Sequence, residues 1–426
     1  MPRRAFACSQ LLSPLVANGR LLLRGMAILA FASVAAAEEP TAITPDELLA
    51  RVRATDPRLA ALDARSAAAR AEPRAARIWT NPTLSWRREE VSASSETATD
   101  DFLELSLPLD VSGRRAHRAA ALDAAADVVA ADAGRERLEI ELAALAAYRD
   151  AAWARERARI LQNGRDALGR ATQIVRKRHE AGDSSGYELG RLEIELATFE
   201  DLLAEARTEL GVARRALARA AGMPAGLLDA ATSLTPPPAP PSPESLVAEA
   251  TAKRGHRLAA LARVRQEEEF SIVAGRAWIP TFELVGGSKT AKAAGVTASG
   301  FTAGLGLTLP LFDRGQADRA RADARARETK AALEAVDRQI RGEVEDASAR
   351  LADRLARSTQ FETAQLPRLE QLVRQAETSY REGEITVFEL VDAHRTARDT
   401  RLRTLDLSLQ ASRAELELWR ALGRNP

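Results

Sequence analysis

The stretch Asp56-Pro-Arg-Leu-Ala-Ala-Leu62 returns as Gly255-His-Arg-Leu-Ala-Ala-Leu261, 199 residues later. Further pairs recur at nearly the same distance along the whole chain: Trp79 and Trp278, Leu107-Pro-Leu109 and Leu309-Pro-Leu311, Gly182 and Gly383, and Gly222 and Gly423. Chance matches between alanine-rich helices would scatter over many offsets, whereas a nearly constant offset indicates an internal duplication. The 426 residues are therefore expected to fold as two copies of one unit.

The composition favours long helices over a core of large aromatic side chains. Aromatic residues make up only 4% of the chain, and the longest segments are runs of Ala, Glu, Arg and Leu. Such runs have the composition of coiled coils, in which small residues allow helix backbones to pack closely. The formal net charge is +1, so no basic excess points to nucleic acid as a partner.

Residues 1–37 are predicted to be an export signal. Arginines precede a short apolar core from Gly25 to Val34, and Ala35 to Ala37 supply small residues for cleavage. A membrane anchor is the weaker interpretation, because a bilayer-spanning helix needs roughly 20 apolar residues. The only cysteine, Cys8, lies in this segment, so the mature chain is expected to carry neither a disulfide nor a lipid-acceptor cysteine.

A proline-rich segment at residues 234–243 separates the two copies, because it cannot form a helix. The first repeat is expected over residues 44–233 and the second over residues 243–426. The predicted helices span residues 46–78, 114–180 and 187–221, then 244–277, 314–382 and 386–422. The predicted strands span residues 83–90 and 101–109, then 281–288 and 300–309, joined by polar loops at residues 92–100 and 289–299.

The strands suit a membrane barrel, although a soluble sandwich would use similar ones. In the last strand Phe301 and Leu305 alternate with Thr302 and Gly304, as in a strand with one apolar face. Four strands are too few to close a barrel, and an open edge is not tolerated in lipid. Two copies would supply eight strands and three copies twelve, and outer-membrane barrels begin at about eight.

Aromatic residues flank the predicted strands at Trp79, Trp278 and Phe312. These positions would lie at a membrane–water interface, where aromatic side chains gather. The residues alone therefore predict a mainly α protein with a small β part.

The order of these elements, LPLFDRGQ at residues 309–316 and YREGEITVFELVDAHRT at residues 380–396 resemble the TolC superfamily of outer-membrane efflux proteins. The resemblance implies duplicated helical hairpins in an α-barrel coiled coil, continuous with a β-barrel that three copies share. It further implies an exit duct in the outer membrane of a Gram-negative bacterium, with its helices in the periplasm. The expected partners are two further copies, outer-membrane lipid, a periplasmic adaptor and an inner-membrane RND-type pump.

The LPLFDRGQ region is most similar to CzcC-like members that serve heavy-metal pumps. Metal cations or small toxic compounds are therefore the expected cargo. A type I secretion channel stays open as an alternative within the superfamily. A periplasmic coiled-coil adaptor or structural protein is the alternative from another class, although an adaptor normally carries one helical hairpin rather than two.

The resemblance also implies roles for individual residues of this chain. Glu389 and Asp392, spaced i, i+3 on one helix face, are similar to acidic residues that line the periplasmic constriction of the family. In three copies they would form carboxylate rings that attract cations, although Glu stands at the first position where the family more often has Asp. Tyr380 and Glu188 are similar to residues that link the closed state. The expected adaptor-docking tips are Gly182, Asp183, Gly383 and Glu384.

No residue pattern indicates an enzyme, a metal site or a cofactor. His117, His179, His256 and His394 are scattered, and each is expected to be exposed. No nucleophile stands with a base and an orienting group. Gly287 to Thr290 superficially matches a phosphate loop, but it lacks the glycine before the lysine and is expected to be an extracellular loop.

Overall fold

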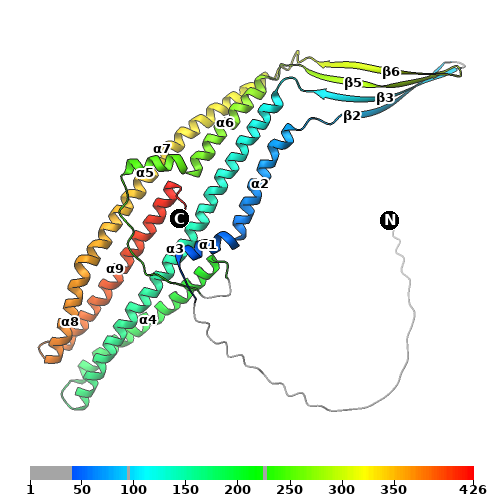
Figure 1. Ribbon diagram of the computed structural model, residues 1–426. Helices are drawn as coiled ribbons and strands as arrows, with labels where there is room; N and C mark the ends of the chain where they lie inside the picture. The colour runs from blue at the N-terminus through cyan, green and yellow to red at the C-terminus, as the bar shows by residue number, and fades with distance from the viewer. Residues whose placement is uncertain (1–40, 94–95, 224–227) are drawn as a thin grey trace, which may run out of the picture. The chain divides into compact units, whose positions relative to one another are not determined.

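The computed structural model describes residues 41–93, 96–223 and 228–426. The predicted signal peptide, with Cys8, lies outside the described residues. The described chain is built from long helices, a four-stranded sheet and a two-stranded sheet (Figure 1). The predicted fold class of duplicated helical hairpins with four long strands is confirmed.

The first repeat contains β1 (Thr41–Ile43), α1 (Pro45–Thr55), α2 (Pro57–Arg77), β2 (Thr83–Ala93), β3 (Glu96–Leu109), α3 (Arg114–Glu180), α4 (Gly186–Ala220) and β4 (Leu228–Ala230). The second contains α5 (Pro243–Lys253), α6 (Gly255–Gly275), β5 (Thr281–Ala293), β6 (Val296–Thr308), α7 (Gln316–Gln360), the π-helix η1 (Phe361–Gln365), α8 (Leu366–Glu382) and α9 (Val387–Leu422). The sequence analysis missed the parallel pair β1 and β4, because three residues are too few for an alternating pattern.

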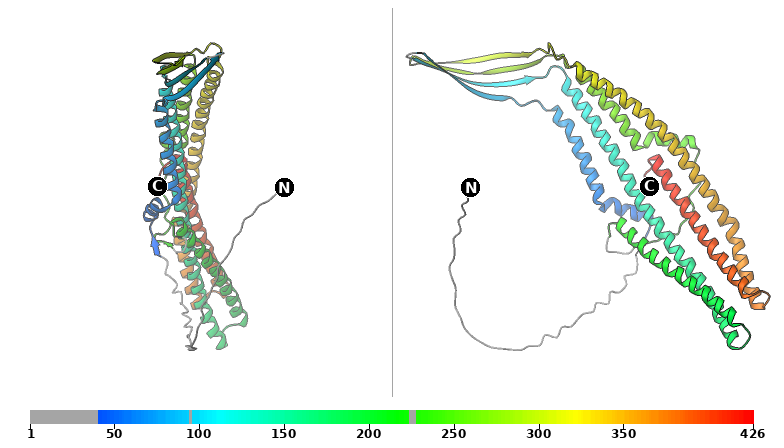
Figure 2. Two further views of the ribbon diagram at one scale, coloured as in Figure 1. Left: turned by 90° about the vertical axis from the view of Figure 1, so that its right-hand side faces the viewer. Right: turned by 180° about the vertical axis from the view of Figure 1, so that it is seen from behind.

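The long strands and the helices attached to them keep one order. The antiparallel sheet runs β2-β3-β5-β6, and α2 packs on α3, α3 on α6 and α6 on α7. Each strand therefore continues into a helix at the same place in the order, as Figures 1 and 2 show. Toward the hairpin tips, α3 packs on α4 and α9, and α9 packs on α7 and α8.

The opening helix of each repeat is broken in two, contrary to prediction. The predicted helix 46–78 breaks at Asp56, because Pro57 has no N–H to continue the first helix. Asp56 instead caps α2, and its Oδ1 accepts from Arg58 N at 2.8 Å. The predicted helix 244–277 breaks at Arg254, whose extended backbone separates α5 from α6.

In each repeat an ion pair fastens the break to the long helix. Arg53, near the end of α1, donates twice at 2.9 Å to Glu141 of α3, and the Glu141 carboxylate is buried. Arg254, between α5 and α6, forms an ion pair with Glu343 of α7. Each short opening helix is thus held in position by a glutamate on the long helix of its own repeat.

The predicted helix 314–382 is continuous but contains the π-turn η1. Pro367 follows this turn, and it can neither donate a backbone hydrogen bond nor fit under the carbonyl four residues earlier. The wider turn accommodates the proline without ending the helix. No described helix carries an apolar stretch long enough for a membrane crossing.

The strands are longer than predicted, because the expected polar loops belong to them. Cross-strand pairing between β5 and β6 continues to Ala293 and Val296. Only Ala294 and Gly295 remain for the turn, with φ angles of 51° and 77°. A two-residue turn with both φ angles positive matches the right-handed twist of a hairpin. The polar segments are therefore strand ends rather than loops.

Hairpin packing predicts a specific steric effect at Gly164 of α3. A Cβ at this position would lie 2.6 Å from Cε1 of Phe199, a fully buried side chain of α4. We expect Gly164→Ala to destabilise the hairpin by roughly 1–3 kcal/mol, because overpacking forces the neighbours to shift. Thermal unfolding followed by circular dichroism would measure the effect.

Gly169→Ala is the matched control on the same helix, because nothing lies within 4 Å of the added Cβ. We expect it to keep or raise the melting temperature, since Ala has the higher helix propensity. Equal melting temperatures for the two variants would contradict the packing argument.

Candidate functional site

Both hairpins turn on a glycine in the left-handed conformation. Gly182 has a φ of 87° and Gly383 a φ of 77°, a region that favours glycine at the end of a helix. Asp183 N and Glu384 N each donate at 2.8 Å to a carbonyl in the last turn of the preceding helix. The four residues predicted as docking tips therefore form the two turns, and all four are exposed.

Each returning helix begins with the same capping box. Glu188 N donates to Ser185 Oγ at 3.2 Å, and Ser185 N donates to Glu188 Oε2 at 3.1 Å. Glu389 N donates to Thr386 Oγ1 at 3.4 Å, and Thr386 N donates to Glu389 Oε2 at 2.7 Å. Hydrogen bonds lower the pKa of both carboxyls, chiefly from the Ser184 hydroxyl at Glu188 and from the Thr386 backbone at Glu389.

These two glutamates are equivalent in the repeats, yet their predicted roles differ. Glu188 was expected to link the closed state and Glu389 to line the constriction. In the structure they share one local role, which is to satisfy backbone amides where α4 and α9 begin.

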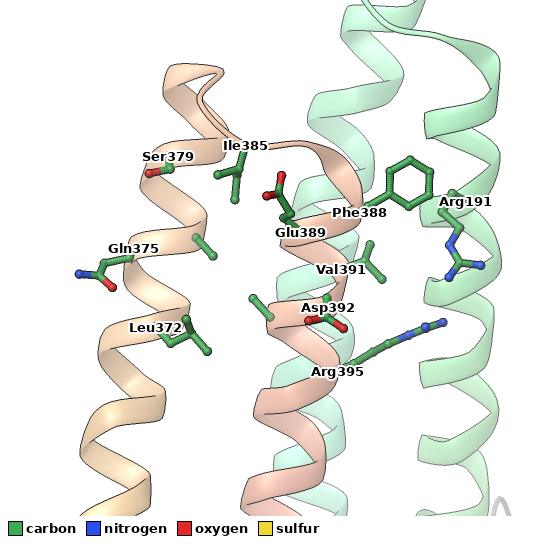
Figure 3. A pocket seen from close by; sticks show the side chains of 12 residues that line it. Arg191, Leu372, Gln375, Ser379, Ile385, Phe388, Glu389, Val391, Asp392 and Arg395 are labelled. Atoms are coloured by element: carbon green, nitrogen blue, oxygen red, sulfur yellow. The ribbon is translucent and has the colours of Figure 1, made fainter.

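A cavity of about 610 Å³ lies between α4, α8 and α9, close to the tips (Figure 3). Glu389 and Asp392 line it from α9, and Arg191 lines it from α4. The two carboxylates have different surroundings, because the Glu389 carboxylate is held by Thr386. Asp392 is exposed, and its charge contributes to the raised pKa of Arg395, of which a hydrogen bond to Glu195 is the main cause.

The buried carboxylate of Glu195, which the sequence analysis missed, joins the two repeats. It is 1% exposed on α4 and accepts a hydrogen bond from Arg395 of α9. Arg398 lies 4.0 Å from its other oxygen and 5.0 Å from the ring centroid of Phe199. A buried carboxylate needs such partners, because its desolvation is strongly unfavourable. The burial of Glu195 could have been predicted from the sequence, because Glu195 lies on the apolar stripe of α4 between Leu192 and Phe199.

Tyr380, predicted as a closed-state link, lies between the two hairpins. It is 9% exposed and packs in an apolar cluster with Leu168 and Val175 of α3. The Arg178 guanidinium lies 5.7 Å from its ring centroid. Burial raises the pKa of the Tyr380 hydroxyl, Arg178 opposes this shift, and the charge of Glu188 adds to it. Tyr380 and Glu188, each predicted as a closed-state link, thus lie near enough for the charge of Glu188 to affect the Tyr380 hydroxyl.

His394 is buried, so the expectation of an exposed histidine was wrong. It is 7% exposed because it shares the inner face of α9 with Leu390 and Ala397. Its Nε2 lies 3.8 Å from Glu377 Oε1 of α8. Burial lowers the pKa of His394, Glu377 opposes this shift, and positive charges on Arg401 and Arg170 add to it.

The other histidines are not clustered. His117 Nδ1 lies 2.7 Å from Glu269 Oε2, and His179 Nδ1 lies 2.8 Å from a backbone oxygen at the first tip. Within the described ranges, no group of three or more His, Cys, Asp or Glu side chains is arranged to hold a metal ion. Gly287 to Thr290 lie inside β5, so their interpretation as a loop was wrong.

Near the helices, the four-stranded sheet has one apolar face and one polar face, whereas toward the hairpin turns both faces carry charged side chains. Trp86 pairs with Leu103, and Leu284 with Leu305, so the register places these four side chains on one face. All four are exposed, and Phe301 on the same face is 87% exposed. An exposed apolar surface of this extent marks an interaction surface.

The predicted interfacial aromatics lie where strands join helices. Trp79 precedes β2, Trp278 precedes β5, and Phe312 follows β6. All three side chains are exposed, and the Arg115 guanidinium lies 4.1 Å from the ring centroid of Trp79. They therefore form an aromatic border between the sheet and the helices.

Solved structures share this fold. The channel-forming CusC has a TM-score of 0.71 and 20% identity, covering 89% of this chain and 91% of its own. The outer membrane protein VceC of Vibrio cholerae has a TM-score of 0.71 and 19% identity, covering 89% and 96%. The hairpins and strands thus have the fold of TolC-like outer-membrane channel proteins.

Two sequence comparisons found similar proteins. Residues 246–424, in the second repeat, match the family model of outer membrane efflux proteins. The cobalt-zinc-cadmium resistance protein CzcC of Cupriavidus metallidurans is 25% identical over 348 residues, which cover 81% of each chain. The second repeat therefore matches the outer membrane efflux protein family, in line with the resemblance of its motifs to the TolC superfamily.

The lowered pKa of His394 predicts a pH-dependent stability. The unfolded chain binds a proton with a pKa of about 6.5, and the folded protein binds it only at lower pH. The contribution to stability is therefore fully present above about pH 6.5 and is lost as the pH falls toward the folded pKa. When the pH is lowered from about 7.5 to about 5.5, we expect the melting temperature to fall less in His394→Gln than in the wild type.

His179→Gln is the control, because His179 is exposed. It should keep the pH dependence of the wild type. An unchanged pH dependence in His394→Gln would show that another group is responsible.

Proposed function

We propose that this chain is the exit duct of a tripartite efflux system and conducts its cargo passively. The observation that carries the proposal is a sheet with one exposed apolar face and two open edges, β2 and β6, whose strands continue into helices in the same order. Copies placed edge to edge would close the strands into a barrel. The attached helices would form a tunnel on the same axis.

Three copies are the proposed assembly. They would supply twelve strands, which lies within the range of outer-membrane barrels that begin at about eight. The TolC resemblance favours three copies over two. The polar face of the sheet would line the lumen, and the apolar face would contact lipid.

The strands are proposed to span the outer membrane of a Gram-negative cell, with the helices in the periplasm. From Phe301 to Leu309 the chain rises about 26 Å at about 3.3 Å per residue. Tilted by the roughly 35–45° of such barrels, this segment would cover about 20 Å of the apolar band of about 25 Å, and the earlier residues of β6 would extend beyond it. Trp79, Trp278 and Phe312 would then lie at the periplasmic interface of the membrane.

Heavy-metal cations are the proposed cargo. The support is the similarity to CzcC, whose name records cobalt, zinc and cadmium resistance. An inner-membrane RND-type pump and a periplasmic adaptor would deliver the cargo. The adaptor would dock at the exposed turns that contain Asp183 and Glu384.

Asp392 is proposed as the main carboxylate of the periplasmic constriction. Glu389 would contribute less, because its carboxylate already accepts from Thr386. Tyr380 and Glu188 are proposed to stabilise the closed state, since Tyr380 fastens α8 to α3.

The proposed function predicts metal tolerance that depends on the whole system. Cells that lack their own duct, but contain the adaptor and pump of a CzcC-type system, should tolerate more zinc when this chain is produced. Native mass spectrometry of the protein from outer membranes should give the mass of three chains. Unchanged tolerance with all three components present, or recovery of the chain in the soluble periplasm, would contradict the proposal.

Two neighbouring substitutions on opposite faces provide the control for membrane insertion. Leu305→Lys places a charge on the apolar face, where it costs about 2–4 kcal/mol near the membrane midplane, and should prevent assembly. Gly304→Lys places the same charge on the polar face and should still assemble, because a Cβ at this position would lie at an ordinary contact distance of 3.8 Å from Val285 Cβ. Equal loss of the assembled protein in both variants would contradict the proposed orientation.

The different surroundings of the two tip carboxylates predict different effects on conductance. We expect Asp392→Asn to lower the cation selectivity of the channel reconstituted in planar bilayers, because it removes an exposed charge at a narrow site. Glu389→Gln should change selectivity less, because that carboxylate serves the helix cap. A larger effect at Glu389 would show that its charge faces the pore despite the cap.

A further inference from the structure

The polar face of the four-stranded sheet carries charged side chains in defined rows. The register brings Arg87, Phe102 and Lys289 into one row, and Glu89 and Asp100 into the next row toward the hairpin turns. Toward the helices, Glu104 lies in the row of Gly287, and Glu283 lies in the row of Gly306. Between the row of Glu283 and the row of Glu89, this face therefore holds two cations and four carboxylates.

The two cations are already neutralised by two of the carboxylates. Arg87 Nε lies 3.4 Å from Glu89 Oε1, and Lys289 Nζ lies 2.7 Å from Asp100 Oδ2. The ring centroid of Phe102 lies 4.7 Å from the Arg87 guanidinium and 4.9 Å from Lys289 Nζ, so it holds the row together. This cluster adds little net charge to the polar face.

Glu104 and Glu283 remain, and within the described part of the chain neither forms an ion pair. Each has a glycine as a cross-strand neighbour. A Cβ at Gly287 would clash with the backbone of Leu103 and Glu104, and a Cβ at Gly306 would lie 3.4 Å from Glu283 Cβ. The glycines add no side chain beside either carboxylate, and Glu283 is exposed whereas Glu104 is half-buried.

We propose that Glu104 and Glu283 set the cation selectivity of the barrel lumen. The inference rests on the proposed function, in which the polar face lines the pore. In a closed trimer the two residues form two rings of three carboxylates. The rings are four residues apart along β5, which is roughly 13 Å at about 3.3 Å per residue.

Rings of fixed negative charge raise the local concentration of cations and lower that of anions. The ligands are hydrated metal cations that pass the rings without losing water to a fixed site. The effect extends over the Debye length, which is about 10 Å at 0.1 M salt and about 3 Å at 1 M. Selectivity from these residues should therefore be strong in dilute salt and weak in concentrated salt.

The test is the reversal potential of the full-length channel in planar bilayers under a potassium chloride gradient. The double variant Glu104→Gln and Glu283→Gln should shift this potential toward the chloride equilibrium potential near 0.1 M salt, and the shift should shrink near 1 M. Ser106→Glu, which adds a carboxylate on the same face between the two rings, should shift the potential in the opposite direction. This second variant keeps the test valid if the double variant fails to assemble.

Glu90→Gln is the matched control, because Glu90 lies on the opposite face of the same sheet. It should leave the reversal potential unchanged. A conducting channel whose potential is unaffected by either polar-face change, or is equally affected by Glu90→Gln, would overturn the inference alone. A wild-type protein that assembles but forms no conducting pore would instead overturn the proposed function.

Discussion

The outer edges of β2 and β6 impose the constraint on which the remaining structure depends. Both strands end the four-stranded sheet, so each presents a row of backbone N–H and C=O groups to its surroundings. In lipid, unpaired groups of this kind are strongly unfavourable, and only closure of the sheet removes them. Helices α2 and α7 continue these edge strands, so the helical layer is open at the same two flanks. Under the proposed function, a single chain is therefore one sector of a larger assembly.

The duplicated features build each hairpin, whereas the unduplicated ones join the two hairpins. Equivalent capping boxes begin α4 and α9, and equivalent glycines end α3 and α8. The ion pair of Glu195 with Arg395 has no counterpart, because Thr396 stands at the position that repeats Glu195. It connects α4 of the first repeat with α9 of the second, close to the tips that are proposed to open.

Charge is distributed unequally along the proposed duct. At the tips, Glu389 is occupied by the backbone of α9, which leaves Asp392 as the exposed carboxylate of the predicted pair. On the polar face of the sheet, four charges form two ion pairs, and Glu104 with Glu283 supplies the excess. In both places, hydrogen bonds and ion pairs determine which acidic residues have a charge that is not already neutralised or engaged. The number of carboxylates therefore overestimates how many can attract a passing ion.

The sequence by itself determined the duplication, the order of helices and strands, and the residues of the tips, because these depend on local patterns such as apolar periodicity and glycine at a turn. It also contained the break at Asp56-Pro57, although helical periodicity on both sides concealed it. Only the tertiary structure decided that His394 and Glu195 are buried, because burial depends on which helix packs against that face. It likewise decided that Glu104 and Glu283 form no ion pair with any described residue, since cross-strand register, and not spacing along the chain, brings cations to carboxylates in a sheet.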